Sequence, residues 1–246
     1  MANTPSTVGK ILILDIETKP ATAYVWRTFK ENIGYEQVLD AGGMICFAAK
    51  FVDEDEIHFY SEWTHSHGEM VKAAHTLIGQ ADAVVTYNGD KFDLPKLNGE
   101  FLLEGLSPPP SVTSIDVLKH VRKMGFLLNR LAFIGPFLRV GAKVKHEGFD
   151  LWAKVLQGDA KARLKMEKYN IQDVVLLEKL YLKIRPYIKN HPHLGLDKRE
   201  CGACGSNKVH ARGYRRTKAF KIQRLQCQGC GAWQDGKKSG VGNEAG

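Results

Sequence analysis

Two carboxylates follow four consecutive aliphatic residues near the start of the chain. Residues 11–14 are Ile-Leu-Ile-Leu, and Asp15 and Glu17 come next, separated by Ile16. The aliphatic run predicts a buried strand of a mostly parallel sheet. Because side chains along a strand repeat every two residues, both carboxylates should share one face and repel each other. A Mg²⁺ or Mn²⁺ ion would remove that conflict. For an isolated Asp-x-Glu pair, solvated or capped acids at a strand end are the better interpretation.

Two further stretches carry acids that could join this pair. Residues 88–93, Asn-Gly-Asp-Lys-Phe-Asp, lie at a predicted junction between a strand and a helix. Tyr169 and Asp173 lie within a long predicted helix, and a separation of four residues places them on one face. Taken singly, Asp93 could equally cap its helix and Tyr169 could be a core aromatic residue. The remaining nearby acids, Asp90, Asp116 and Asp150, are expected to be solvated or to cap helices.

Four of the five cysteines form two C-x-x-C pairs in the last fifth of the chain. Cys201 and Cys204 make the first pair, Cys227 and Cys230 the second, and 22 residues separate the pairs. Four thiolates at this spacing predict one structural, tetrahedral Zn²⁺ ion in a zinc ribbon. Two disulfides are the alternative, which a reducing cytosol disfavours. The fifth cysteine, Cys46, lies in an apolar run and is expected to be an inert core thiol.

The positive charge of the chain is concentrated beside these cysteines. Residues 198–246 hold 11 Lys and Arg against 3 Asp and Glu, a net charge of +8, whereas residues 1–197 have 24 of each. Basic and aromatic side chains alternate there, which favours phosphate contacts and base stacking. The candidates are Lys208, Arg212, Tyr214, Arg215, Arg216, Lys218, Phe220, Lys221 and Arg224. A solubilising tail and a ribbon that binds a protein partner remain alternatives.

Periodicity and turn residues predict an α/β domain followed by a small module. Strands are expected over 11–14, 44–52, 57–60, 83–87 and 112–117, and helices over 68–79 and 93–103, with short helices over 117–156. The residues of the 68–79 helix that should face inward are Met70, Val71, Ala74, Leu77 and Ile78. A long helix should run from about Gly158 to Ile184, with Leu164, Tyr169, Val174, Leu177, Leu180 and Tyr181 facing the core. The expected division is a domain over residues 1–190, a linker over 191–199, a zinc ribbon over 200–234 and a disordered tail over 235–246.

Nothing in the sequence predicts insertion into a membrane. The first ten residues are polar and make no signal peptide, and no apolar run approaches the length of a membrane-spanning helix. We therefore expect a cytoplasmic protein with no membrane partner.

Taken together and in order, the three acidic stretches resemble a known family. They are similar to the motifs of the DEDD 3′–5′ exonucleases of the ribonuclease-H-like superfamily, in the tyrosine subgroup akin to the exonuclease domain of family B DNA polymerases. The first motif, D-x-E, matches Asp15 and Glu17. The second, N-x-x-x-F-D, matches Asn88, Phe92 and Asp93, and the third, Y-x-x-x-D, matches Tyr169 and Asp173. A short motif alone matches by chance, but the ordered set spans residues 15–173.

The resemblance implies a fold and a mechanism. It implies a ribonuclease-H-like mixed sheet flanked by helices and two Mg²⁺ or Mn²⁺ ions about 4 Å apart that cleave phosphodiester bonds. Asp15 would bridge the ions, Glu17 and Asp173 would hold the water-activating ion, and Asp93 the other. Tyr169 would orient the attacking water in a role close to general-base assistance, and Asn88 and Phe92 would contact substrate. Position 168 is Lys, so the subgroup with a histidine there does not fit.

The implied partner is nucleic acid, with DNA favoured over RNA. The chain shows no polymerase palm or thumb. Two other functions on the same fold stay open at this point: a structure-selective endonuclease or recombination protein, and a binding module without catalysis.

Overall fold

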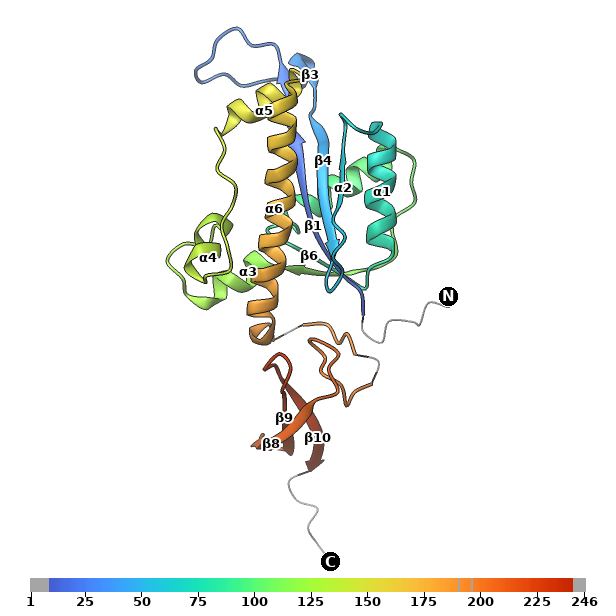
Figure 1. Ribbon diagram of the computed structural model, residues 1–246, viewed down its shortest axis with the longest axis vertical. Coiled ribbons are helices and arrows are strands. Elements are labelled where there is room, and N and C mark those ends of the chain that lie inside the picture. Colours follow the sequence, from blue (N-terminus) through green and yellow to red (C-terminus); the bar gives the residue numbers. More distant parts are fainter. Residues whose placement is uncertain (1–8, 190, 196, 241–246) are drawn as a thin grey trace, which may run out of the picture.

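A five-stranded mixed sheet forms the centre of the body of the molecule (Figure 1). The computed structural model describes residues 9–189, 191–195 and 197–240. The strand order is β5-β4-β1-β6-β7. Strand β1 pairs in parallel with β6 and antiparallel with β4; β7 adds in parallel to β6, and β5 antiparallel to β4. The bounds are β1 Ile11–Lys19, β4 Gly43–Phe51, β5 His58–Ser61, β6 Ala83–Thr86 and β7 Thr113–Asp116. The predicted α/β class and mixed sheet are confirmed.

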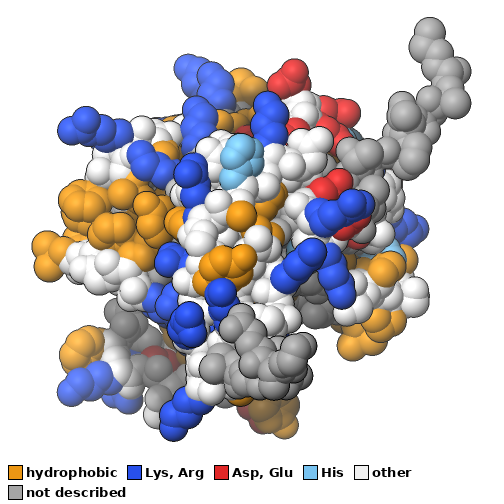
Figure 2. Space-filling model, turned by 90° about the horizontal axis from the view of Figure 1, so that it is seen from below, with side chains coloured by type: hydrophobic (Ala, Val, Ile, Leu, Met, Phe, Trp, Pro, Cys, Tyr) orange, Lys and Arg blue, Asp and Glu red, His pale blue; other side chains and the backbone are white. Residues whose placement is uncertain are grey.

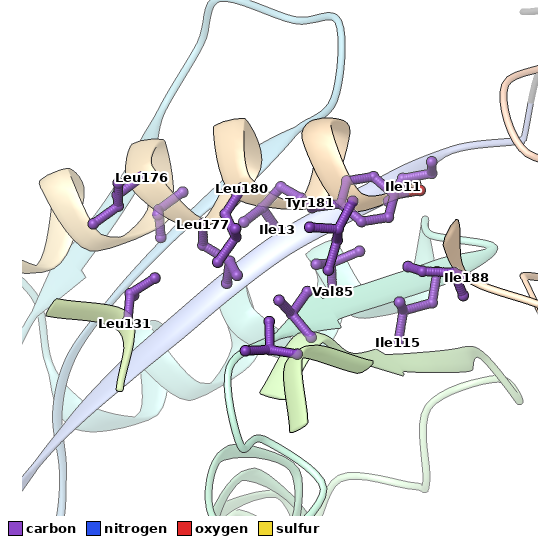
Figure 3. Close-up of a cluster of buried hydrophobic side chains, with 14 of the residues drawn as sticks. Ile11, Ile13, Val85, Ile115, Leu131, Leu176, Leu177, Leu180, Tyr181 and Ile188 are labelled. Atoms are coloured by element: carbon purple, nitrogen blue, oxygen red, sulfur yellow. The ribbon is translucent and has the colours of Figure 1, made fainter. Parts of the chain in front are cut away.

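Helices cover both faces of the sheet, and β1 supplies side chains to both. Leu12 and Leu14 pack with residues of α1 (His67–Gly79) and α2 (Asp93–Leu103) on one face. Ile11 and Ile13 pack on the other face with residues of α6 (Ala160–Ile184), among them Leu177, Leu180 and Tyr181 (Figure 3). The alternation of side chains along a strand therefore explains why β1 reads as uninterrupted aliphatic residues. Burying both faces of β1 fixes the position of the acids at its end.

Two predictions for the helical faces have different outcomes. All five inward residues expected for α1 are buried: Met70, Val71, Ala74, Leu77 and Ile78. In α6, five of the six expected core residues are buried. The prediction for Leu164 is wrong, because 58% of its surface is exposed. The first turns of α6 pack against α5 (Phe149–Leu156) through Ala162 and Met166 instead. The other helices are short: α3 Val117–Val121 and α4 Leu131–Phe137.

The connection that follows β1 forms an exposed arm. Two short strands, β2 (Thr22–Ala23) and β3 (Val38–Asp40), pair at its base, where Lys19 and Asp40 form an ion pair of 2.6 Å. Large apolar side chains along it are exposed rather than packed: Tyr24, Val25, Trp26, Phe29, Ile33, Tyr35, Val38 and Leu39. The arm projects at the end of the body where α6 begins (Figure 1).

A three-stranded antiparallel sheet forms the C-terminal module. Its order is β10-β9-β8, with β8 Val209–Arg216, β9 Phe220–Cys227 and β10 Trp233–Gly240. Residues 235–240, which the sequence assigned to a disordered tail, therefore belong to the sheet, because the β9 ladder continues to the pair Gly240 and Phe220. The rest of the predicted tail, residues 241–246, lies outside the described residues. The module sits at the end of the body where α6 ends, away from the arm (Figure 1).

Within the part of the chain that the structure describes, no helix is both long enough and apolar enough to cross a bilayer. The cytoplasmic location stays a prediction.

Candidate active site

Three of the four predicted acids converge where β1 meets α6. Asp15, Glu17 and Asp173 each offer a carboxylate oxygen, and these oxygens lie within 4.8 Å of one another. Asp15 pairs across β4 with Ala48 and Glu17 with Cys46, and the ladder shifts register directly after Glu17. Asp173 comes from the middle of α6 and is 98% buried. The two-residue repeat of β1 thus puts Asp15 and Glu17 on the face that α6 covers.

Asp93, the fourth acid, is directed toward β1. Its Oδ1 accepts a hydrogen bond of 3.1 Å from the backbone N–H of Ile16, between the two acids of β1. Asp93 is the first residue of α2, and the capping position is held by Phe92, whose side chain makes no capping hydrogen bond. The carboxylate of Asp93 thus accepts hydrogen bonds from its own N–H at the start of α2 and from that of Ile16 on β1.

The pKa values of these acids are shifted in the direction expected for a cation site. Removal from water raises the pKa of Asp15 well above its usual range, and the charges of Asp93, Glu17 and Asp173 raise it further. Burial, followed by the charge of Asp173, raises the pKa of Glu17 to about 8. Burial also raises the pKa of Asp93 to about 6 against the effect of its backbone hydrogen bonds. Positive charge at this place would therefore stabilise the ionised forms.

Unused ligand capacity makes the acids suitable for divalent ions. The Oδ1 atom of Asp173 is buried and has no hydrogen-bond partner among the residues that the structure describes. A buried carboxylate oxygen without a partner is unfavourable unless something satisfies it. Hard oxygen ligands at this density fit Mg²⁺ or Mn²⁺. The donor set thus fits the metal ions that the acids imply.

Lys143 is a site residue that the sequence did not reveal. Its Nζ lies 2.6 Å from Oδ2 of Asp173 and donates a hydrogen bond of 2.9 Å to the hydroxyl of Tyr169. Burial alone would lower the pKa of Lys143, but the Asp173 carboxylate outweighs burial and raises it. Lys143 comes from an irregular segment between α4 and α5, so no periodicity marks it.

Asn170 was also missed, although it follows Tyr169 directly. Its Nδ2 donates hydrogen bonds to Oδ2 of Asp15 at 2.7 Å and to the backbone oxygen of Asp15 at 3.2 Å. Asn170 is fully buried, and within the described part of the chain its Oδ1 has no hydrogen-bond partner. An amide on the buried face of a helix is the signal that could have found it, because such a group needs a partner.

Tyr169 lies among aromatic side chains at the edge of this site. Its ring is 4.9 Å from His146 and 6.1 Å from Trp152 between centroids, both edge to face. Burial, followed by the charge of Asp173, raises the pKa of Tyr169, so its hydroxyl keeps its proton near neutral pH. This favours a hydrogen-bond donor over a proton acceptor.

The second motif shapes the turn before α2. Asn88 takes a φ of 73°, in the left-handed region that asparagine tolerates, and its N–H donates to Oδ1 of Asp116 at 2.9 Å. The same Oδ1 caps α3 through the N–H of Leu118 at 3.0 Å, as expected for a capping residue. Asp150, also expected outside the site, pairs with Lys154 at the surface. Phe92 is 40% exposed.

The four cysteines of the C-terminal module form one cluster. Their sulfur atoms lie within 4.8 Å of one another, with Cys201 and Cys230 at 3.6 Å and Cys204 and Cys227 at 3.7 Å. A disulfide requires about 2.05 Å, whereas tetrahedral thiolates at about 2.3 Å from Zn²⁺ lie roughly 3.8 Å apart. Burial alone would raise the pKa of Cys227, but N–H groups of Cys230 and Gly229 help lower it to about 7. The cluster fits one structural Zn²⁺ ion.

The predicted basic residues lie on the strands and turns of this module. Arg215 is paired with Asp235 through two nitrogens, at 3.0 and 2.5 Å. Lys221 stacks over the ring of Tyr214 at 4.5 Å. The other residues predicted to contact nucleic acid have exposed side chains: Lys208, Arg212, Arg216, Lys218, Phe220 and Arg224. Seen from this end of the molecule, Lys and Arg spread over the surface while Asp and Glu gather toward one side (Figure 2).

Comparisons with known proteins agree with this geometry. A family profile described as RNase_H superfamily matches residues 36–185, more than half of the chain. The chain belongs to the RNase_H superfamily. A solved structure, the family B DNA polymerase from the hyperthermophilic archaeon Pyrobaculum calidifontis, is similar at a TM-score of 0.54 and 14% sequence identity. The likeness covers 73% of this chain and 25% of the polymerase chain, and it shows a shared fold. Among curated proteins, none matches.

Membership in the RNase_H superfamily supports a nuclease-type function that uses divalent metal ions and acts on nucleic acid. The matched region includes Asp93, Tyr169 and Asp173, while Asp15 and Glu17 precede it. The structure joins the two parts, because the oxygens of Asp15 and Glu17 lie beside those of Asp173.

Proposed function

We propose that the protein is a metal-dependent 3′–5′ exonuclease that hydrolyses phosphodiester bonds of nucleic acid, DNA more than RNA. The observation that carries the proposal is the convergence of Asp15, Glu17 and Asp173 within 4.8 Å, with Asp93 hydrogen-bonded to the same strand end. Tyr169, one helical turn before Asp173, completes the set of the tyrosine subgroup. The proposed catalytic domain covers residues 1–190, and the zinc ribbon begins near residue 200.

We assign a role to each residue of this set. Asp15, Glu17 and Asp173 would hold one Mg²⁺ or Mn²⁺ ion, and Asp15 and Asp93 a second. When bound, such ions would lower the pKa of water and neutralise charge on the leaving oxygen. The hydroxyl of Tyr169 accepts a hydrogen bond from Lys143, and its own proton can be donated, at present toward the neighbouring carboxylate of Asp173. Tyr169 would therefore orient the attacking water as a donor. Asn170 keeps the carboxylate of Asp15 in place.

The test is degradation of single- and double-stranded oligonucleotides, labelled at one end, with Mg²⁺ or Mn²⁺. Wild type should shorten strands stepwise from the 3′ end, and EDTA should abolish the reaction. Asp15→Ala should remove nearly all activity while the protein stays folded, because the ions lose a ligand. Asp150→Ala is the matched control, since this acid pairs with Lys154 at the surface. Full activity of Asp15→Ala would contradict the proposal.

Two further substrates separate the alternatives. Cleavage of a circular or 3′-blocked strand would identify an endonuclease on the same fold. Binding of strands without cleavage under any divalent ion would identify a binding module.

A further inference from the structure

A cavity of about 600 Å³ lies between the end of the body and the zinc ribbon. The body contributes the segment after α6, including Ile188 and Lys189, and the ribbon contributes the first cysteine turn and residues of β8, β9 and β10. Ligand sites of small molecules and nucleotides commonly have volumes of about 300–1,000 Å³. The cavity is therefore large enough for a nucleotide unit.

The lining combines cations with one exposed aromatic ring. Lys189 and Arg224 are exposed, and the guanidinium of Arg224 stacks at 4.6 Å from the ring of Trp233, which is 49% exposed. The acid of the lining, Asp235, is already paired with Arg215. The remaining charge is positive, so an anionic ligand with a flat aromatic group fits best.

The two walls are held together by direct contacts. The N–H of Leu194 donates to the carbonyl of Gly202 in the ribbon at 2.8 Å, and the N–H of Gly9 donates to the carbonyl of Leu194 at 2.8 Å. Tyr181 of α6 hydrogen-bonds with Nε2 of His191 at 2.7 Å. Gly202 packs so closely that a Cβ there would meet the ring of His193 at 2.9 Å. The cavity is consequently formed before any ligand arrives.

The cavity is far from the proposed catalytic acids. Asp173 lies eleven residues before Ile184 on α6, a rise of about 16 Å at 1.5 Å per residue. The cavity begins beyond that helix end, where the ribbon adjoins the body (Figure 1). It is therefore a site separate from the catalytic centre.

We propose that this cavity is a second binding site for the nucleic-acid strand that is being degraded. One base would stack on the exposed part of the Trp233 ring that Arg224 does not cover, and adjacent phosphates would contact Lys189 and Arg224. This inference rests on the proposed exonuclease function. A strand in contact with both sites must span more than about 16 Å, or about five nucleotides at the 3.4 Å per nucleotide of a helical strand. A dinucleotide is too short to contact both sites, so it can occupy only the catalytic centre.

The test compares a long single strand with a dinucleotide as substrates of the full chain. Trp233→Ala should raise the KM for the long strand by about tenfold, for the lost stacking of one base. Arg224→Gln should also raise this KM, through the loss of a phosphate contact, and both variants should leave the kcat for the long strand unchanged. Neither should change the kinetics of the dinucleotide. Lys189→Ala should act in the same direction and reduce the salt slope by about one. Lys179→Ala, an exposed lysine of α6, is the matched control.

Further measurements keep the outcomes distinct. Zinc content shows whether the ribbon of each variant is folded, and Arg224→Gln should retain zinc because Arg224 is exposed. An unchanged KM and salt slope in folded variants would overturn the second site and point to a protein partner in the cavity. An equal rise in the KM for the dinucleotide would also overturn the second site, because it would place the cavity in the catalytic centre. If the wild-type protein degrades neither substrate but its affinity for the long strand depends on Arg224, the exonuclease proposal fails and the second binding site stands.

Discussion

Lys143 brings a positive charge to a site otherwise made of buried acids. Its ammonium group contacts both Asp173 and the hydroxyl of Tyr169. One oxygen of the Asp173 carboxylate contacts Lys143, and the other has no hydrogen-bond partner in residues 9–189, 191–195 and 197–240. We interpret Lys143 as the group that orients Tyr169 while leaving half of Asp173 available to an ion.

The first prediction concerns this hydrogen bond. Tyr169→Phe should slow cleavage by about 10²-fold, the order expected for one acid–base group, with binding of divalent ions retained. Tyr187→Phe is the control, because Tyr187 is 75% exposed on the segment after α6. Single-turnover rates and titration with Mn²⁺ measure the two effects. A wild-type rate for Tyr169→Phe would show that the hydroxyl has no part in the reaction.

Lys143→Met should slow cleavage through Tyr169. We expect a loss of about tenfold, smaller than that of Tyr169→Phe, because the hydroxyl remains but its orientation is lost. The double variant should be no slower than Tyr169→Phe alone, since both changes remove one contact. Multiplied losses in the double variant would show that Lys143 acts independently of Tyr169.

The raised pKa of Glu17 makes the metal-free protein sensitive to pH. The folded state holds this proton up to a pKa of about 8, while an unfolded glutamate releases it near its usual value of 4.5. Between these values the folded state binds more protons, so stability should fall as pH rises from about 4.5 to 8. Thermal unfolding in EDTA should show this fall, Glu17→Gln should reduce it, and Mn²⁺ should oppose it at the upper end. Glu36→Gln on the exposed arm is the control, and equal slopes for Glu17→Gln and wild type would contradict the assignment.

Sequence reasoning found the acids and missed their polar neighbours for a definite reason. Asp15 and Glu17 are recognisable because a carboxylate directly after a buried strand is unusual, and Asp173 because it precedes an apolar run. Lys143 comes from a segment without regular structure, so its contact with Asp173 depends on the tertiary fold alone.

At the level of elements, the turn between β6 and α2 positions the second motif. Gly89 lies in this turn, and a Cβ there would meet Oγ1 of Thr86 at 2.2 Å and its Cβ at 2.4 Å. Thr86 is fully buried in β6, so it cannot move aside at low cost. The turn therefore requires glycine for close approach.

The corresponding prediction uses two glycines of the same region. Gly89→Ala should destabilise the protein by about 1–3 kcal/mol, the range for overpacking, and lower activity by moving Asp93. Gly99→Ala is the matched control, because Gly99 lies within α2 with nothing within 4 Å of its Cβ position. It should stabilise by about 0.5–1 kcal/mol through helix propensity. Chemical denaturation measures both, and equal effects would refute the account of the turn.

Shortening a side chain in the exposed arm should change the stability of the protein far less than shortening one in the core. Trp26→Ala should leave the free energy of unfolding within about 0.5 kcal/mol of wild type, because its side chain is 94% exposed. Leu14→Ala should cost about 2–5 kcal/mol, because Leu14 is fully buried on β1. Thermal and urea unfolding compare the two. A large loss for Trp26→Ala would show that the arm packs against another part of the protein.

The sequence predicted a helix or strand correctly where the spacing of its apolar residues followed one clear repeat. The five inward residues of α1 repeat at helical spacing and are all buried. Leu164 fits the same rule on α6 yet is exposed, because the first turns of α6 bury Ala162 and Met166 instead, in a cluster with residues of α5 and β4. Strand β10 contains Gly236 and two lysines, a composition that predicted a disordered tail. It forms a strand because it pairs with β9.

At the scale of the whole molecule, charge and catalysis are divided between two parts. The proposed catalytic residues lie in residues 1–197, which carry no net charge, and the excess of +8 lies in residues 198–246. The sequence could predict this division. It could not predict that the ribbon packs beside the end of α6, because the contacts of His191 and Leu194 that hold it come from a linker without periodicity.

Truncation after residue 196 should separate binding from cleavage. Affinity for nucleic acid should fall, most clearly at moderate salt, and the salt slope should flatten by a few units, since each phosphate contact contributes about −0.7 to −0.9 on a log–log scale. Arg212, Arg216 and Lys218 should contribute more of this change than Arg215, whose charge Asp235 already balances. Binding at several salt concentrations measures the slope. Single-turnover cleavage at saturating protein should be nearly unchanged, because the truncated chain keeps every proposed catalytic residue.

Removal of zinc should reproduce the truncation, because the four sulfur atoms of the cluster connect the two cysteine turns of the ribbon. Cys201→Ser should therefore lose zinc and flatten the salt slope as the truncation does. Cys46→Ser, in the buried part of β4, should keep its zinc and serve as the control for loss of a thiol. Equal salt slopes for the truncated and full chains would assign the ribbon to a protein partner. A truncated chain that binds strands normally but cannot cut them would contradict the placement of the ribbon at the end of α6, away from the acids.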